Sequence, residues 1–177
     1  MQETPAPNFE TPEVRCPNAL KKDGTKVDLR RLTDDASPAV VSYIVEEEYG
    51  WVTAINASKG LLIGYIWPRE DYPWFDAWRH VADGKPFARG LEFGTTGLHQ
   101  PGPVLVEKGK IFDQHLFRFI DADETQDFSY ATFLMKIPKD FNGVDSVRYG
   151  MGQLMVVERG GKKREIAMNV GELFAAK

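Results

Sequence analysis

The sequence predicts an all-β fold, and three observations carry this prediction. Short runs rich in Val, Ile, Tyr, Phe and Thr alternate with Gly, Pro and Asp along the chain, which is the pattern of successive strands and turns. No long segment has the apolar spacing of a helix. The chain has 177 residues, 42% of them hydrophobic, which is enough for one buried core. We therefore expect a soluble, mostly antiparallel β-sandwich.

Eight strands are expected between the turn signals. They cover residues 39–46, 50–56, 61–66, 87–92, 110–120, 128–137, 147–158 and 164–170. The Gly160-Gly161 pair marks a hairpin between the last two strands, because glycine readily adopts positive φ. The acidic segment 121–126 marks a second hairpin, between the strands on either side of it. The aromatic segment 72–80 is expected to form a turn, because Pro73 disfavours a helix.

The expected domain organisation is an arm followed by one domain. Residues 1–26 contain four prolines and no apolar periodicity, so we expect a flexible N-terminal arm. Residues 27–177 then form a single β-sandwich domain. We find no internal repeat and no low-complexity tract.

Charge and composition exclude several partners and cofactors. With 22 basic and 26 acidic residues the net charge is −4, and no block of like charges is present to follow a nucleic-acid backbone. The longest apolar run, residues 61–67, is far shorter than the ~20 residues of a membrane span. No leader is visible in residues 1–17, and the compartment stays open. Cys16 is the single cysteine, and we expect no cofactor and no Cys/His metal site.

An aromatic segment in the middle of the chain is the first candidate for a binding site. Three of the four tryptophans lie within residues 67–78, interleaved with charged side chains. The candidate ligand-binding residues there are Trp67, Arg69, Trp74, Trp78, Arg79 and His80. Aromatic faces stack on the C–H faces of sugars, and charged groups bind their hydroxyls. The pattern therefore predicts a carbohydrate site, with core packing of the aromatics as the alternative.

Glu92 is the second candidate, and it follows the aromatic segment. Strand alternation places Ala88, Gly90 and Glu92 on one face, and Arg89 on the other. Small neighbours leave open space above the Glu92 carboxylate, which a ligand can fill. The alternative is an ordinary ion pair of Glu92 with an arginine. Arg89 and His99, which flank Glu92 in the sequence, are added to the candidate binding residues.

Several motifs together resemble the galactose mutarotase-like (aldose 1-epimerase) superfamily, in its later, C-terminal part. They are Asp28-Leu29-Arg30, Glu48-Tyr49-Gly50-Trp51-Val52, Trp67 with its aromatic segment, Arg89-Gly90-Leu91-Glu92-Phe93-Gly94, and Asp121-Ala122-Asp123-Glu124-Thr125. The resemblance covers about residues 28–137. It implies a β-supersandwich, incomplete in this chain, and a sugar substrate.

The resemblance also implies a mechanism. Glu92 matches the glutamate that removes the proton from the anomeric hydroxyl, while an acid protonates the ring oxygen and the ring opens and recloses. The family's acid is a histidine upstream of the glutamate, and neither His80 nor His99 matches it. His115 is expected to be structural. A non-catalytic sugar-binding or assembly module is therefore the alternative to an epimerase.

Other interpretations rank lower. A glycosidase would pair Glu92 with Glu70 or Asp71 across a scissile bond. A divalent ion would be held by carboxylates drawn from Glu70, Asp71, Asp76 and Glu92. A structural β protein would bind no small ligand. A shortened form of the sandwich that the resemblance implies exposes edges and apolar faces that tend to pair, so we expect a homodimer or larger assembly.

Overall fold

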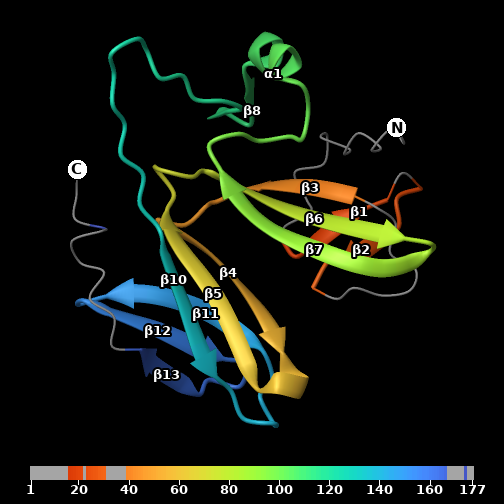
Figure 1. The fold of residues 1–177 in the computed structure, drawn as a ribbon, viewed down its shortest axis with the longest axis vertical. Helices are drawn as coiled ribbons and strands as arrows, with labels where there is room; N and C mark the ends of the chain where they lie inside the picture. The colour runs from red at the N-terminus through yellow and green to blue at the C-terminus, as the bar shows by residue number, and fades with distance from the viewer. Residues whose placement is uncertain (1–15, 22, 31–38, 167–173, 175–177) are drawn as a thin grey trace. The chain divides into compact units, whose positions relative to one another are not determined.

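The computed structural model describes residues 16–21, 23–30, 39–166 and 174, and it confirms the all-β fold (Figure 1). Within these described residues, the strands pair antiparallel in five small sheets. The chain divides into two compact units, residues 1–45 with 73–124 and residues 46–72 with 125–177. That residues 27–177 form one domain stays a prediction. The described residues contain no helix with the length and apolar character that a membrane span requires.

The first unit is built on a three-stranded sheet. Its strands are β3 (Ala39–Ile44), β6 (Trp74–Ala82) and β7 (Lys85–Gly94), in the order β3-β6-β7. Asp83 and Gly84 join β6 to β7 with φ of 51° and 72°, the two-residue turn that suits the twist of antiparallel strands. This Asp-Gly turn fixes which residues of β6 and β7 lie opposite each other.

Two small modules accompany this sheet in the described part of the first unit. One is a ribbon of β1 (Asn18–Leu20) and β2 (Lys26–Asp28). The other contains α1 (Gly102–Lys108), β8 (Lys110–Ile111) and β9 (Gln114–His115). Trp74 connects the second module to β6, since its indole N–H donates to the His115 carbonyl at 2.7 Å. Trp74 also packs in a buried cluster with Leu98, Leu105 and Leu116.

The second unit is a sandwich of two three-stranded sheets. One contains β4 (Tyr49–Asn56), β5 (Leu61–Pro68) and β10 (Ala131–Lys136), with the short 3-10 helix η1 (Ala57–Lys59) joining β4 to β5. The other contains β11 (Val144–Gly150), β12 (Gln153–Glu158) and β13 (Lys163–Ile166). Leu62, Ile66 and Phe133 of the first sheet share one core with Leu154 and Val156 of the second.

The expected hairpin at Gly160-Gly161 is confirmed, with φ of 97° and 87° at the two glycines. Residues 167–170 of its second predicted strand lie outside the described residues.

Two predicted single strands instead contain hairpins. Residues 147–158 turn at Met151-Gly152, and residues 110–115 turn at Phe112-Asp113, while residues 116–120 are not in a strand. Phe112, Asp113 and Met151 all have positive φ, which Phe and Met rarely adopt. Phe112-Asp113 is therefore a weak turn signal, whereas the prediction overlooked Gly152 at the other turn.

Three further expectations need correction. The segment 72–80 is mostly strand β6 rather than a turn, because Pro73 precedes the strand and leaves its backbone free to pair. The segment 121–126 does not join a hairpin, since β9 and β10 belong to different sheets. Within the expected arm, residues 16–26 include β1 and the start of β2, while residues 1–15 lie outside the described residues.

Gly64 of β5 tests the packing of the sandwich core. A Cβ at this position would lie 2.1 Å from Cζ of Phe133, so the Phe133 ring occupies the space that any side chain would need. We expect Gly64→Ala to lower the free energy of unfolding by about 1–3 kcal/mol, the usual cost of overpacking. Urea unfolding followed by tryptophan fluorescence measures the change.

Gly150→Ala is the matched control for this prediction. Gly150 also lies in a strand of the second unit, but a Cβ there would meet nothing within 4 Å. We expect the control to change stability by less than about 0.5 kcal/mol. Equal stability of the two variants would contradict the packing that the structure assigns to Phe133.

Candidate functional site

Three polar side chains form a row across the sheet of the first unit. Ser42 of β3 pairs with Asp76 of β6, and Asp76 pairs with Glu92 of β7. Directly opposed residues on antiparallel strands place their side chains on the same face. The pairing of Trp78 with Gly90 and of Arg79 with Arg89 agrees with the alternation expected for β7. One face of the sheet therefore carries a hydroxyl and two carboxylates side by side.

Asp76 is the most perturbed group of this row. The Ser42 hydroxyl donates to Asp76 Oδ1 and accepts from the Leu98 amide at 3.0 Å. Burial raises the pKa of Asp76 to about 6; the Ser42 hydrogen bond and His99 oppose this rise, and the negative charge of Glu92 adds to it. A carboxyl with such a pKa can bind or release a proton close to neutral pH.

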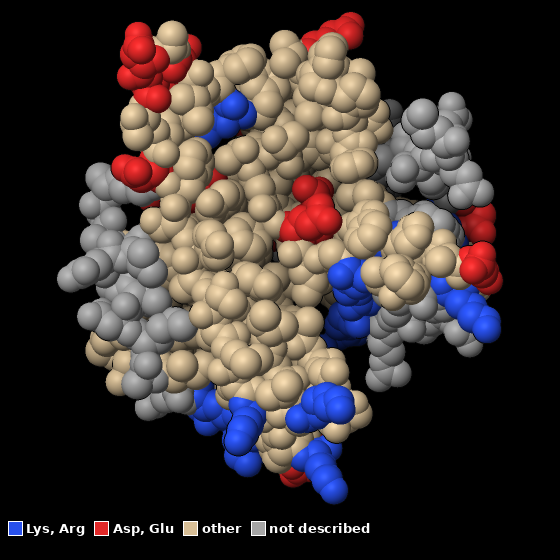
Figure 2. Space-filling view, viewed as in Figure 1, with Lys and Arg blue, Asp and Glu red and all other residues tan. Residues whose placement is uncertain are grey.

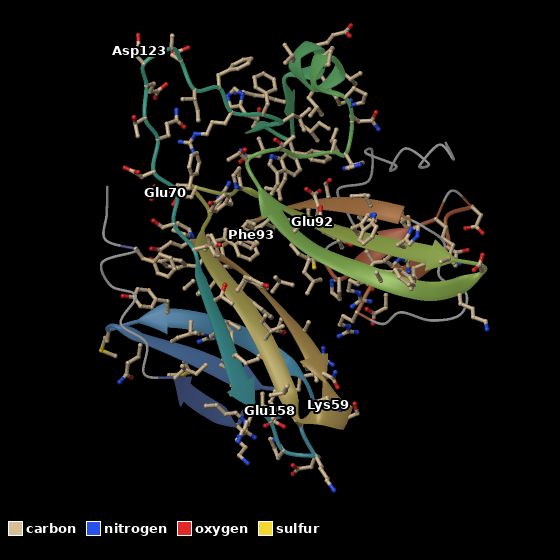
Figure 3. The ribbon with its side chains drawn as sticks, viewed as in Figure 1. Lys59, Glu70, Glu92, Phe93, Asp123 and Glu158 are labelled. Carbon is tan, nitrogen blue, oxygen red and sulfur yellow. The ribbon has the colours of Figure 1, made fainter. Side chains whose placement is uncertain are left out.

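The Glu92 carboxylate is exposed beside an aromatic ring. A Cβ on Gly90 would lie 2.6 Å from Glu92 Oε1 and 3.2 Å from Cε3 of Trp78, so the carboxylate and the indole flank the same point above the strand. Within the described part of the chain, Glu92 makes no hydrogen bond or ion pair. Figure 2 shows acidic atoms exposed among mainly uncharged ones where Figure 3 labels Glu92.

Three rings continue from Glu92 along the same face. Trp78 stacks on His80, with centroids 5.7 Å apart and planes 6° apart, and His80 meets Phe87 edge to face at 5.9 Å. The register of β6 and β7 shifts after His80, which makes Phe87 the extra residue of a bulge. A bulge re-aims side chains, and Phe87 is 74% exposed. We call Trp78, His80 and Phe87 the aromatic strip.

The two arginines predicted near Glu92 lie on the opposite face of the sheet. Arg79 and Arg89 pair across β6 and β7, and Arg79 is only 4% exposed. Arg89 donates to the Arg30 carbonyl at 2.7 Å, just after β2. Burial and the neighbouring Arg79 charge lower the pKa of Arg89, while Asp28 opposes this change. Within this unit, neither guanidinium shares a face with Glu92.

The other two predicted tryptophans are buried. Trp74 is 2% exposed, and its ring fills the space that a Cβ on Gly97 would need. Trp67 belongs to the second unit and is fully buried; its ring lies over Gly50, and its N–H donates to the Tyr72 carbonyl at 2.9 Å. Of the three clustered tryptophans, only Trp78 is partly exposed.

The remaining candidates divide between the two units. His99 lies in the loop after β7 and acts electrostatically on Asp76. Arg69 belongs to the second unit, where it donates to the Glu46 carbonyl at 3.4 Å. Glu70 and Asp71 belong to that unit too, and Asp71 is buried and accepts from the Ser129 amide at 2.8 Å. No group of three potential metal ligands occurs among the residues that the structure describes.

Comparison with known proteins adds no family. No family model, curated protein or solved structure matches the chain. The resemblance to the mutarotase-like superfamily therefore stays a prediction.

The sequence analysis did not identify two residues of this face, and it did not assign a third residue to the sugar site. Ser42 and Phe87 were not candidates, and Asp76 was considered only as a ligand of a divalent ion. The Asp83-Gly84 pair is a strong hairpin signal. It would have identified β6 and, through the register, the pairing of Asp76 with Glu92. The bulge that turns Phe87 toward His80 has no comparable signal.

Asp76 predicts a specific dependence of stability on pH. Its pKa rises from 3.8 to about 6 in the folded chain, so the folded state binds this proton more tightly than the unfolded state does. The contribution of Asp76 is therefore most favourable below about pH 4 and falls as the pH rises to about 6, by at most about 3 kcal/mol. Asp76→Asn removes this loss.

Urea unfolding at several pH values between about 4 and 7 measures the effect. We expect the stability of Asp76→Asn relative to the parent chain to increase as the pH rises through this window. Asp113→Asn, at an exposed turn, is the control and leaves the pH profile unchanged. Parallel profiles for Asp76→Asn and the parent would show that the fold does not raise the pKa of Asp76.

Proposed function

We propose that the Asp76–Glu92 face of the first unit binds a carbohydrate, and that the protein is a sugar-recognising module. The observation that carries the proposal is the aromatic strip, which runs beside an exposed carboxylate. Sugars stack their C–H faces on such rings, while carboxylates accept hydrogen bonds from their hydroxyls. The strip places several rings in succession, which suits an oligosaccharide better than a single sugar.

A second function, interconversion of sugar anomers, is favoured by one specific observation. Asp76 lies beside Glu92 and has a pKa of about 6, so it fits the role of the acid that no histidine of the expected pattern supplies. Glu92 would remove the proton from the anomeric hydroxyl, and Asp76 would protonate the ring oxygen. Both oxygens are bonded to the same carbon, so adjacent carboxyls can serve them.

Substitution of the strip tests sugar binding. We expect Trp78→Ala to weaken oligosaccharide binding at least about tenfold, because the stacked ring is lost. Phe87→Ala is a second variant that keeps the fold, since this ring is largely exposed, and it should weaken binding in the same direction. NMR titration with a panel of neutral and acidic sugars, following the indole N–H signals, measures affinity.

Phe112→Ala is the control, because Phe112 is 60% exposed on another part of the same unit. Unchanged affinity in both strip variants would contradict the proposed surface. Glu92→Gln then separates the two functions. An epimerase loses accelerated anomer exchange while it still binds sugar, whereas a binding module shows no exchange in either form.

We also propose that the protein self-associates through the outer face of the β4-β5-β10 sheet. Ala54, Ile63 and Leu134 lie in one row across this face, and Val52 and Tyr65 lie in the next. Leu134 is 67% exposed. Contiguous apolar surface of this kind is typical of a contact between proteins.

Light scattering over a dilution series tests this self-association. We expect a dimer that dissociates on dilution, and a monomer at all concentrations for Leu134→Glu, because the charge would be buried without a partner. Val104→Glu, on exposed α1 of the other unit, should leave the dimer intact. A parent chain that is monomeric throughout would refute the proposal.

A further inference from the structure

We infer that the Asp76–Glu92 face selects sugars that carry a protonated amine, as in oligomers of glucosamine, over neutral and acidic sugars. This inference rests on the proposed carbohydrate-binding function and specifies its ligand. Two carboxylates lie next to each other in the row, and an aromatic ring borders one of them. A primary ammonium can donate to carboxylates and also interact with the face of an aromatic ring.

Charge is the first argument for this selectivity. Glu92 and Asp76 form no ion pair within the described residues, and the basic residues of β6 and β7 nearest to them in sequence, Arg79 and Arg89, lie on the other face. Two like charges opposite each other across antiparallel strands are unfavourable. A bound cation relieves this repulsion, whereas a hydroxyl group does not, and an acidic sugar would increase it.

The arrangement suits an organic cation better than a metal ion. Calcium takes 6–8 oxygen ligands and magnesium demands octahedral geometry, but the described residues bring together no group of three His, Cys, Asp or Glu ligands. An ammonium needs only three acceptors. The Asp76 and Glu92 carboxylates can provide them, while the aromatic strip packs against the apolar face of the sugar ring.

The protonation of Asp76 links this selectivity to pH. The groups that face Asp76 are the Ser42 hydroxyl from β3, Glu92 from β7 and His99 from the loop after β7. Below pH 6 Asp76 takes up a proton, and the face loses one of its two negative charges. Affinity for the amine-bearing sugar should therefore fall as the pH is lowered through this range, whereas affinity for a neutral sugar should change little.

Three trisaccharides with the same backbone linkage form the test: the glucosamine trimer, its N-acetylated form and the glucose trimer. At about pH 6.5 we expect the glucosamine trimer to bind at least about tenfold more tightly than both neutral trimers. Glu92→Gln and Asp76→Asn should each reduce this preference to less than about threefold, because each removes one of the two negative charges that attract the ammonium. NMR titration of the full chain measures all three affinities.

Glu107→Gln is the control for general attraction to an acidic chain, because it removes one exposed charge from α1 and should leave the preference unchanged. If Glu107→Gln reduces the preference as much as Glu92→Gln does, the attraction is nonspecific and the inference fails. Equal binding of all three trimers refutes the amine selectivity but leaves carbohydrate binding intact. If none of them binds, the proposed function fails and the inference with it.

Discussion

The backbone ladder between β6 and its two neighbours is the constraint on which the candidate site depends. Its register places Ser42, Asp76 and Glu92 in one row. A slip of one residue would move Asp76 to the opposite face and bring Phe75 or Ala77 into its place. The Asp83-Gly84 turn prevents this slip on one side of β6. On the other side, the hydrogen bond from Ser42 to Asp76 joins β3 to β6.

Glycines provide the space in which several large aromatic side chains pack. Gly50, Gly64 and Gly97 each face a ring that fills the space above them, from Trp67, Phe133 and Trp74 respectively. Above Gly90 the indole of Trp78 shares the space with the carboxylate of Glu92. Two tryptophans are thereby buried as core, while Trp78 stays partly exposed and available for a ligand. The absence of a Cβ thus serves packing at three positions and leaves room for a carboxylate at the fourth.

Much of the fold could be predicted from residue patterns. The alternation of β7 correctly separated Glu92 from Arg89, and Gly160-Gly161 correctly located a hairpin. The wrong predictions fall at positions where the local preference of a residue differs from the conformation that the chain adopts there. Phe112 and Met151 turn the chain with positive φ, a conformation that the rest of the fold imposes on residues that do not favour it. Pro73 suggested a turn, although the strand begins directly after it.

The sequence by itself determined which side chains share a strand face, because the period of two is a property of the backbone. It also determined that a carboxylate would stand beside small residues in β7. Only the tertiary structure decided which aromatics are exposed, that Ser42 lies beside Asp76 and that Phe87 joins Trp78 and His80. These features depend on pairing between strands and on a bulge. The pairing of β3 with β6 joins residues that are distant in sequence, and the bulge at Phe87 has no local signal, so the residue patterns do not record these features.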